Sequence, residues 1–318
     1  MTQIPDIQAP EINQSSLKWW QVFNPAIYLI SILPAISVFI LAGENPVWQQ
    51  GLVFSTLAVV LLQHAINLFN DASDWKLGAD TEKMDSWVRL HHGNTSPVTR
   101  HALISFIIGG LIGLSVLIVG HKLWIVFIAL PLIGLGYLYN AGETPLSYNW
   151  TGEWVTGLCY GPGVFGCLWF VAGLAFNLTA ILGMFAFAAL AVSLLLSHQP
   201  PQIETDRQAG KKSFCVRYGV QKTCQVSIAL FTAALLLIGT GLSINYSIPY
   251  LQYALFSLIL MFSLYLVKAG PNPKKILLLS STILLLSVIA LPWLTPARAA
   301  PGSAAHLSWS ISNEAPSI

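Results

Sequence analysis

Side chains that can bind a metal ion gather in one short stretch of an otherwise apolar chain. Within fourteen positions stand Asn67, Asn70, Asp71, Asp74 and Asp80. In a helix, Asn67, Asp71 and Asp74 would share one face, at positions i, i+4 and i+7. Carboxylates this close repel one another and lose hydration at a membrane unless a cation neutralises them. Hard oxygen ligands with no His or Cys among them suit Mg²⁺, which commonly bridges carboxylates to phosphate oxygens. The stretch therefore predicts a magnesium site and a ligand that carries phosphate.

The elements that must position these residues are membrane helices. Hydrophobic residues make up 55% of the 318 residues and charged residues only 9%, and apolar runs of roughly twenty residues recur, as in polytopic membrane proteins. Nine such runs are predicted to span a membrane, over residues 26–43, 48–69, 102–119, 123–140, 153–173, 178–198, 223–243, 249–267 and 275–294. Because the runs lack the alternation of a membrane β-barrel, we expect an all-α polytopic membrane protein with nine transmembrane helices around a central cavity.

Basic residues are distributed unevenly over the predicted loops. Thirteen of the fifteen Lys and Arg residues lie on the side that holds the N-terminus and the loops after the second, fourth, sixth and eighth spans. Such a bias marks the cytoplasmic side. We therefore expect the N-terminus and the acidic loops to face the cytoplasm, with the protein in a bacterial inner membrane. The chain should comprise a cytoplasmic segment over 1–25, one nine-helix domain over 26–295 and a disordered tail over 296–318.

Other ligand classes find little support in the sequence. The four cysteines show neither a zinc-binding spacing nor a disulfide framework. The net charge of +2 reflects the loop bias and does not indicate a nucleic-acid partner. The expected partners are thus the lipid bilayer and small molecules.

Two loops on the predicted cytoplasmic side carry further polar residues. The loop over 81–100 is too short for a domain and long for a connection, which favours a lid over a cytoplasmic site. Asp85 and Arg89 in this loop either face the site or are solvated charges. In the loop after the fourth span, Glu153 either complements a helix N-terminus or belongs to a polar pocket. The run of Gly and Pro over 161–163 predicts a kink or a close helix contact in the fifth span.

A second polar insertion over 197–219 repeats the order of the first, four spans later. It leaves an apolar run through amides, then acids, a glycine and basic residues. The repetition predicts two related halves whose loops meet over one central cavity. Lys211 and Arg217 suit diphosphate oxygens, whereas an ordinary cytoplasmic loop would explain the basic residues but not the acids at the membrane edge.

Three ordered segments resemble the UbiA superfamily of intramembrane aromatic prenyltransferases. The stretch from Asn70 to Asp80 is similar to the NDxxDxxxGxD form of that family. The stretch from Glu204 to Gly219 is similar to its RDxExDxxxGKxTxxVRxG form, with Gln202 where the form has Asp. The segment over 145–163 resembles the pattern of the 1,4-dihydroxy-2-naphthoate branch, which makes menaquinone and phylloquinone precursors.

The resemblance implies Mg²⁺-dependent transfer of a polyprenyl group from polyprenyl diphosphate to an aromatic acceptor, 1,4-dihydroxy-2-naphthoate. The metal ligands that it implies are Asp71, Asp74, Asp80 and Asp206. Catalytic roles are implied for Asp71, Asp74, Asp206 and Lys211. The implied substrate-binding residues are Asn67, Asn70, Arg89, Tyr139, Asn140, Tyr148, Glu153, Gln202 and Arg217.

Several alternatives stay open at this point. Within the family, 4-hydroxybenzoate or homogentisate can serve as the acceptor, and Gln202 is compatible with a catalytically silent paralogue. Outside the family, a cation-coupled transporter also places acids in membrane helices. A sugar-phosphate transferase acting on polyprenyl phosphate would require a nucleotide-sugar site, for which the sequence offers no candidate.

Overall fold

The computed structural model describes residues 18–42, 48–79, 83, 85–248, 250–268, 270–293 and 295–296. The longer helices are α2 (Leu29–Leu41), α3 (Gln49–Leu77), α5 (Thr95–Val119), α6 (Val126–Leu138), α9 (Leu178–His198), α12 (Val220–Asn245), α13 (Tyr250–Lys268) and α14 (Pro273–Ala290). The shorter helices are α1 (Trp19–Phe23), α4 (Trp87–Leu90), α7 (Gly152–Leu158), α8 (Cys167–Val171), α10 (Ile203–Gln208) and α11 (Phe214–Tyr218). Single turns of 3₁₀ helix are η1 (Pro25–Tyr28), η2 (Leu123–Ile125), η3 (Leu146–Tyr148), η5 (Pro200–Gln202) and η6 (Leu291–Trp293). The two-residue strands β1 (Tyr246–Ser247) and β2 (Thr295–Pro296) pair antiparallel.

The helices confirm a helical protein of the membrane type. Six helical stretches among the described residues are long and apolar enough to cross a membrane. They are Gln49–Leu77, Thr95–Val119, Gly152–Val171, Leu178–Gln208, Val220–Asn245 and Pro273–Ala290. Three shorter apolar helices, over Pro25–Leu41, Leu123–Leu138 and Gln252–Lys268, fall on the remaining predicted runs.

The acidic stretch belongs to α3 rather than to a loop after it. The predicted span ends at residue 69, but α3 continues to Leu77, and Gly78 with φ of 85° ends it in the left-handed conformation. Polar side chains lower the hydropathy of the last turns, whereas the main-chain hydrogen bonds of the helix are unaffected. The helix α5 begins at Thr95, before the predicted start of its span, so the segment between α3 and α5 is shorter than the predicted lid and includes the helical turn α4.

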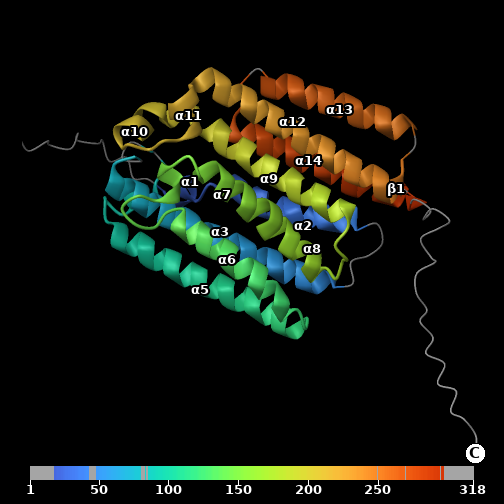
Figure 1. The fold of residues 1–318 in the computed structure, drawn as a ribbon, viewed down its shortest axis with the longest axis horizontal. Coiled ribbons are helices and arrows are strands. Elements are labelled where there is room, and N and C mark those ends of the chain that lie inside the picture. The colour runs from blue at the N-terminus through green and yellow to red at the C-terminus, as the bar shows by residue number, and fades with distance from the viewer. Residues whose placement is uncertain are drawn as a thin grey trace, which may run out of the picture.

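Most of the helices run roughly along one common direction (Figure 1). The short helices α10 and α11 gather at one end of the molecule and β1 lies at the opposite end (Figure 1). The helix α3 packs along α5, and α9 packs along α12. In both pairs a long helix with polar residues at its end is followed by a short helical segment and then by its long packing partner. The predicted relation between two halves stays a prediction.

The fifth predicted span is irregular, as its glycines and proline predict. It passes from α7 into the π-helix η4 (Cys159–Gly166) and then into α8. Pro162 has no N–H to give to a regular helix, and a Cβ on Gly161 would collide with the carbonyl oxygen of Met184 in α9. The π-helix therefore lies against α9 at a distance that only glycine permits, and the predicted close contact is confirmed.

Candidate functional site

The acids of the first polar segment lie at the end of α3 and are almost fully buried. Asp71 is 3% exposed and Asp74 is 2% exposed. The Oδ2 atom of Asp71 accepts hydrogen bonds from Ser86 Oγ at 3.0 Å and from the Val88 main-chain N–H at 3.1 Å. Its Oδ1 atom lies 3.6 Å from Lys83 Nζ. Asp71 thus fastens the segment between α3 and α5 to the end of α3.

Lys211 joins the two polar segments. Its Nζ atom donates to Asp74 Oδ2 at 3.1 Å and lies 3.7 Å from Asp206 Oδ1. The same ammonium group faces the ring of Tyr148, 5.3 Å from the centroid. Asp206 is 2% exposed, and its Oδ2 atom accepts a hydrogen bond from Ser213 Oγ at 2.8 Å. Residues 137 positions apart therefore meet in one cluster, as the similarity of the two segments predicts.

Glu153 fastens the second polar segment to α7. It stands in the first turn of α7, and its Oε1 atom accepts hydrogen bonds from the Phe214 N–H at 2.8 Å and from Gln199 Nε2 at 3.3 Å. Its Oε2 atom accepts one from Arg217 Nη2 at 3.2 Å. Gln199 in turn accepts a hydrogen bond from the Cys215 N–H at 3.0 Å. Both roles left open for Glu153 are thus present, because it begins a helix and also belongs to a polar network.

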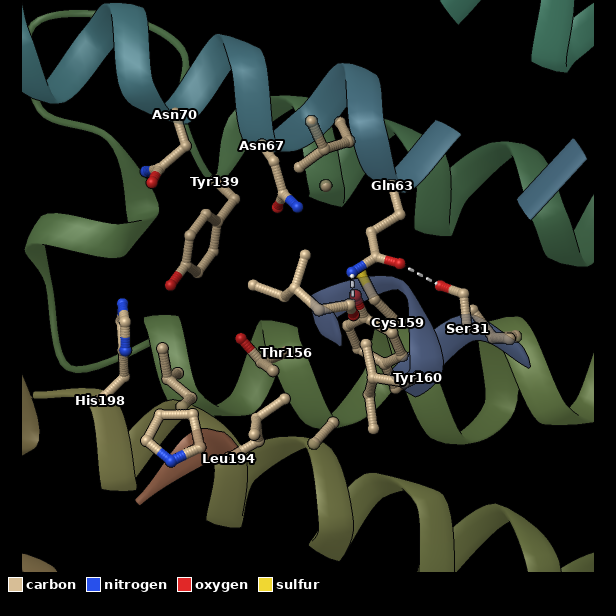
Figure 2. A pocket seen from close by; sticks show the side chains of 18 of the residues that line it. Ser31, Gln63, Asn67, Asn70, Tyr139, Thr156, Cys159, Tyr160, Leu194 and His198 are labelled. Atoms are coloured by element: carbon tan, nitrogen blue, oxygen red, sulfur yellow. Dashed lines mark hydrogen bonds between the residues drawn. The ribbon is translucent and has the colours of Figure 1, made fainter. Parts of the chain in front are cut away.

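Two cavities meet beside this cluster. The larger one, of about 730 Å³, lies between the helices and has mostly apolar walls. The smaller one, of about 40 Å³, is polar and is lined by Gln202, Asp206 and Lys211 among others. Tyr139 and His198 line both cavities, and Figure 2 shows their side chains at one end of the larger cavity. The site therefore combines a small charged compartment with a large apolar one.

Tyr139 lies where the two compartments adjoin. The phenol of a tyrosine has an ordinary pKa of about 10, so it is protonated at neutral pH. It can therefore donate a hydrogen bond to an anionic oxygen.

Amide side chains form the polar part of the larger cavity. Asn70 Nδ2 donates to Asn140 Oδ1 at 2.9 Å, and Asn140 Nδ2 donates to the Ile66 carbonyl oxygen at 3.0 Å. Gln63 and Asn67 project into the same cavity from α3 (Figure 2). An apolar cavity with a few polar groups on one wall is typical of a small-molecule site.

Not every predicted site residue joins this arrangement. Arg89 lies on α4 and lines neither cavity. Arg217 faces Glu153 instead of either cavity, and the face of the Tyr148 ring is turned to Lys211. Asp80 lies outside the described residues, so its predicted role as a metal ligand stays a prediction.

Several polar residues of the site were missed by reasoning from the sequence. Among them are Gln63, Lys83, Ser86, His198, Gln199 and Ser213. Ser86 carries a local signal, because a serine before a short apolar stretch is a favourable N-cap, and its Oγ accepts from the Val88 and Arg89 N–H groups. For Gln63, Gln199 and Ser213 the partners come from other elements, and no local pattern indicates them.

The chemistry of the donor set fits a hard divalent cation. Among the described residues, the three buried carboxylates of Asp71, Asp74 and Asp206 lie near two lysines, which leaves these five groups with one formal negative charge. No three acidic, His or Cys side chains within the described ranges come close enough to hold an ion by themselves. The protein would therefore supply one or two carboxylates to an ion, and phosphate oxygens and water the rest. This division of ligands is usual for Mg²⁺.

Comparisons with known proteins identify relatives of this chain. A model of the UbiA prenyltransferase family matches residues 29–281. A 1,4-dihydroxy-2-naphthoate octaprenyltransferase of Bacillus subtilis (strain 168) is 27% identical over 71% of this chain and 74% of its own length. A 2-carboxy-1,4-naphthoquinone phytyltransferase of Synechocystis sp. is 31% identical over 69% of this chain and 72% of its own. The structure of a UbiA homologue from Archaeoglobus fulgidus bound to GPP and Mg²⁺ superposes with a TM-score of 0.60 at 16% identity, covering 87% of this chain and 100% of that one.

Proposed function

Because this chain belongs to the UbiA prenyltransferase family, we propose that it transfers a polyprenyl group from polyprenyl diphosphate to 1,4-dihydroxy-2-naphthoate. The two curated relatives reported above are named for reactions of this kind on naphthoate or naphthoquinone acceptors. The observation that carries the proposal is the cluster in which Lys211 lies between Asp74 and Asp206. Lys211 and Asp206 line the small compartment, which adjoins the large apolar cavity.

The two compartments suit the two ends of a polyprenyl diphosphate. The charged diphosphate would lie at Lys211 and the three buried aspartates, and the polyprenyl chain along the apolar walls. The small compartment has room for only a few water molecules. Binding of the diphosphate therefore requires Lys211 to move from between Asp74 and Asp206, and its ammonium group then donates to diphosphate oxygens.

The residues present support electrophilic substitution on the aromatic ring. Among the described residues, one or two of the carboxylates of Asp71, Asp74 and Asp206 would hold Mg²⁺, with Asp80 as a further predicted ligand. When bound, Mg²⁺ supplies positive charge that stabilises the diphosphate as the allylic C–O bond breaks. Lys211 and the protonated Tyr139 add hydrogen bonds to the leaving group. The electron pair of the bond leaves with the diphosphate, and the naphthoate ring carbon bonds to the allylic carbon. The new bond forms at the ring carbon that bears the carboxylate, and the carboxylate then leaves as CO₂, so that the electron pair of its C–C bond restores the aromatic ring. The apolar walls keep water from the cation.

We infer nine membrane spans for the domain over 26–295. The six long helices and the three shorter apolar ones support this count. The uneven distribution of Lys and Arg supports a cytoplasmic position for the polar ends of α3 and α9. Labelling of single cysteines introduced near Lys76 and Lys122 in intact and opened cells tests this orientation; labelling of both positions from the same side would contradict it.

A product assay tests the proposed reaction. Purified protein is incubated with geranylgeranyl diphosphate, Mg²⁺ and 1,4-dihydroxy-2-naphthoate, and the prenylated product is identified by mass. We expect product that disappears on chelation of Mg²⁺ and in the Asp74→Asn variant. Turnover of 4-hydroxybenzoate or homogentisate that equals or exceeds that of 1,4-dihydroxy-2-naphthoate would contradict the proposed acceptor. Diphosphate binding without product on any of the three acceptors would contradict the proposed reaction.

A further inference from the structure

The cavity wall formed by α3 carries three carboxamides at successive turns. Gln63, Asn67 and Asn70 all line the larger cavity, and Figure 2 shows them projecting into it from the same face of α3. The spacings of four and three residues place them on this one face. They therefore form a polar stripe inside a compartment that is otherwise mostly apolar.

Two of the three carboxamides are engaged by the protein itself. Gln63 accepts a hydrogen bond from Ser31 Oγ at 2.5 Å and donates to the Ile27 carbonyl oxygen at 3.1 Å. Asn70 donates to Asn140 at 2.9 Å. Within the described part of the chain, the side chain of Asn67 makes no such hydrogen bond, although it stands between the other two.

A carboxamide with no protein partner on an apolar wall indicates a polar group of a ligand. Leaving both its donor and its acceptor without partners there costs free energy, whereas an apolar side chain of similar size would not. A polyprenyl chain has no polar atom to offer at this depth. The diphosphate would lie one turn further along α3, beside Asp71 and Asp74. The remaining substrate is the aromatic acceptor, which carries hydroxyl and carboxylate oxygens.

We propose that Asn67 hydrogen-bonds an oxygen substituent of the aromatic acceptor and thereby selects the acceptor and orients its ring. This inference rests on the proposed function and adds a specificity-determining residue to it. A carboxamide suits this role because its N–H₂ group donates to a carboxylate and its oxygen accepts from a hydroxyl group. The ring is then held one helical turn from the carboxylates that would hold the diphosphate, so the ring carbon and the allylic carbon lie in the same part of the cavity.

The Asn67→Leu variant tests the inference, because leucine has a similar volume and no polar atom. We expect the KM for 1,4-dihydroxy-2-naphthoate to rise about tenfold, the loss typical of one unmade buried hydrogen bond, while the KM for geranylgeranyl diphosphate changes less than twofold. The control is Thr99→Val, a polar-to-apolar exchange on α5 whose hydroxyl donates to the Thr95 carbonyl oxygen. A thermal shift on adding geranylgeranyl diphosphate and Mg²⁺ shows whether each variant folds and keeps the diphosphate compartment.

Acceptor analogues identify the group that Asn67 binds. Binding of 1,4-dihydroxy-2-naphthoate, 1,4-dihydroxynaphthalene and 1-hydroxy-2-naphthoate is measured by equilibrium dialysis on the wild type and on Asn67→Leu. The effect of the substitution should vanish for the analogue that lacks the contacted group. Equal acceptor affinity of the two proteins, or an equal loss for both substrates, would overturn the role of Asn67. Absence of turnover by the wild type together with an Asn67-dependent naphthoate affinity would reject the proposed reaction and retain the acceptor site.

Discussion

The two polar segments that meet at Lys211 hold their acids in different ways. In the first, Asp71 and Asp74 stand in the last turns of α3, a regular helix of 29 residues whose side chains pack on α5. In the second, Asp206 stands in α10, a helix of six residues. The segment that follows α10 is held by Glu153 of α7, through the Phe214 main chain and the side chain of Arg217.

The difference indicates that the two polar segments contribute in different ways. The first segment presents two buried negative charges from the end of a long helix. The second segment contributes one buried acid, Asp206, and a cation, Lys211, and its position depends on Glu153. Since the cation bridges Asp74 and Asp206, we expect changes in the first half to remove charge directly. Changes in the second half should act mainly by displacing Lys211 and Asp206.

The largest effect is expected for Asp74→Asn. The exchange removes one buried carboxylate and its pairing with Lys211, so kcat should fall about 100-fold or more and the Mg²⁺ dependence should weaken. Prenyl transfer at increasing Mg²⁺ measures both. The control is Glu204→Gln, because the Glu204 side chain is 69% exposed in an ion pair with Arg207, and exposed pairs contribute little. An equal fall in kcat for the two variants would contradict the claim that the buried Asp74 matters more for catalysis than the exposed Glu204.

A smaller loss is expected for Glu153→Ala. The Phe214 N–H and Gln199 Nε2 lose their acceptor, the segment carrying Lys211 loosens, and kcat/KM should fall about 10- to 100-fold, as for residues that orient metal ligands. The Glu153→Gln variant keeps an acceptor oxygen and should retain more activity. Hydrogen exchange over residues 211–219 should rise in the alanine variant and much less in the glutamine variant. Unchanged exchange together with equal activity losses would show that Glu153 contacts a substrate instead.

Local patterns in the sequence were sufficient to predict that the acids gather in one cluster and where most of the helices form. The apolar runs predicted where helices form because burial in lipid requires long apolar stretches. The repeated order of amides, acids and bases predicted that the two polar segments would meet over one cavity. The end of α3 was wrong by eight residues, since hydropathy falls at Asn67 while the helix continues.

Contacts between residues far apart in the sequence could not be predicted from local sequence patterns. Glu153 has the sequence context of a helix N-terminus, and its partners lie 46 to 64 residues away. The role of Gln63 depends on Ser31 in another helix. For Arg217 the basic character indicated a diphosphate ligand, but a nearer carboxylate attracts it. Pairings of this kind follow from the packing of the halves and leave no local spacing.

A moderate effect is expected for Ser86→Ala, which tests how Ser86 supports Asp71 in the first polar segment. Ser86 caps α4 and donates to Asp71, so the exchange removes about 1 kcal/mol of stabilisation from this segment. A loss of about 1 kcal/mol corresponds to about a fivefold change in affinity, so the KM for geranylgeranyl diphosphate should rise about fivefold. The kcat should stay nearly unchanged. Steady-state kinetics provide the test, and Ser96→Ala, an exposed serine at the start of α5, is the control. A fall in kcat as large as that of Asp74→Asn would make Ser86 part of the reacting centre.

The smallest effect is expected for Gln202→Asp, which gives the second half an acid it lacks. Gln202 lines the small compartment beside Asp206 and Lys211, so a carboxylate there would offer Mg²⁺ a charged ligand in place of an amide and should lower the Mg²⁺ concentration at half-maximal rate about threefold. The residue is also the N-cap of α10 and makes no capping hydrogen bond, so aspartate should raise the melting temperature slightly even without metal. The control Gln208→Asp places the same charge at an exposed position in α10. It should change both the Mg²⁺ concentration at half-maximal rate and the melting temperature by less than Gln202→Asp does. Loss of activity in Gln202→Asp with intact folding would mean that the second half requires an uncharged ligand at this position, because a further buried carboxylate would then hold Lys211 away from the diphosphate.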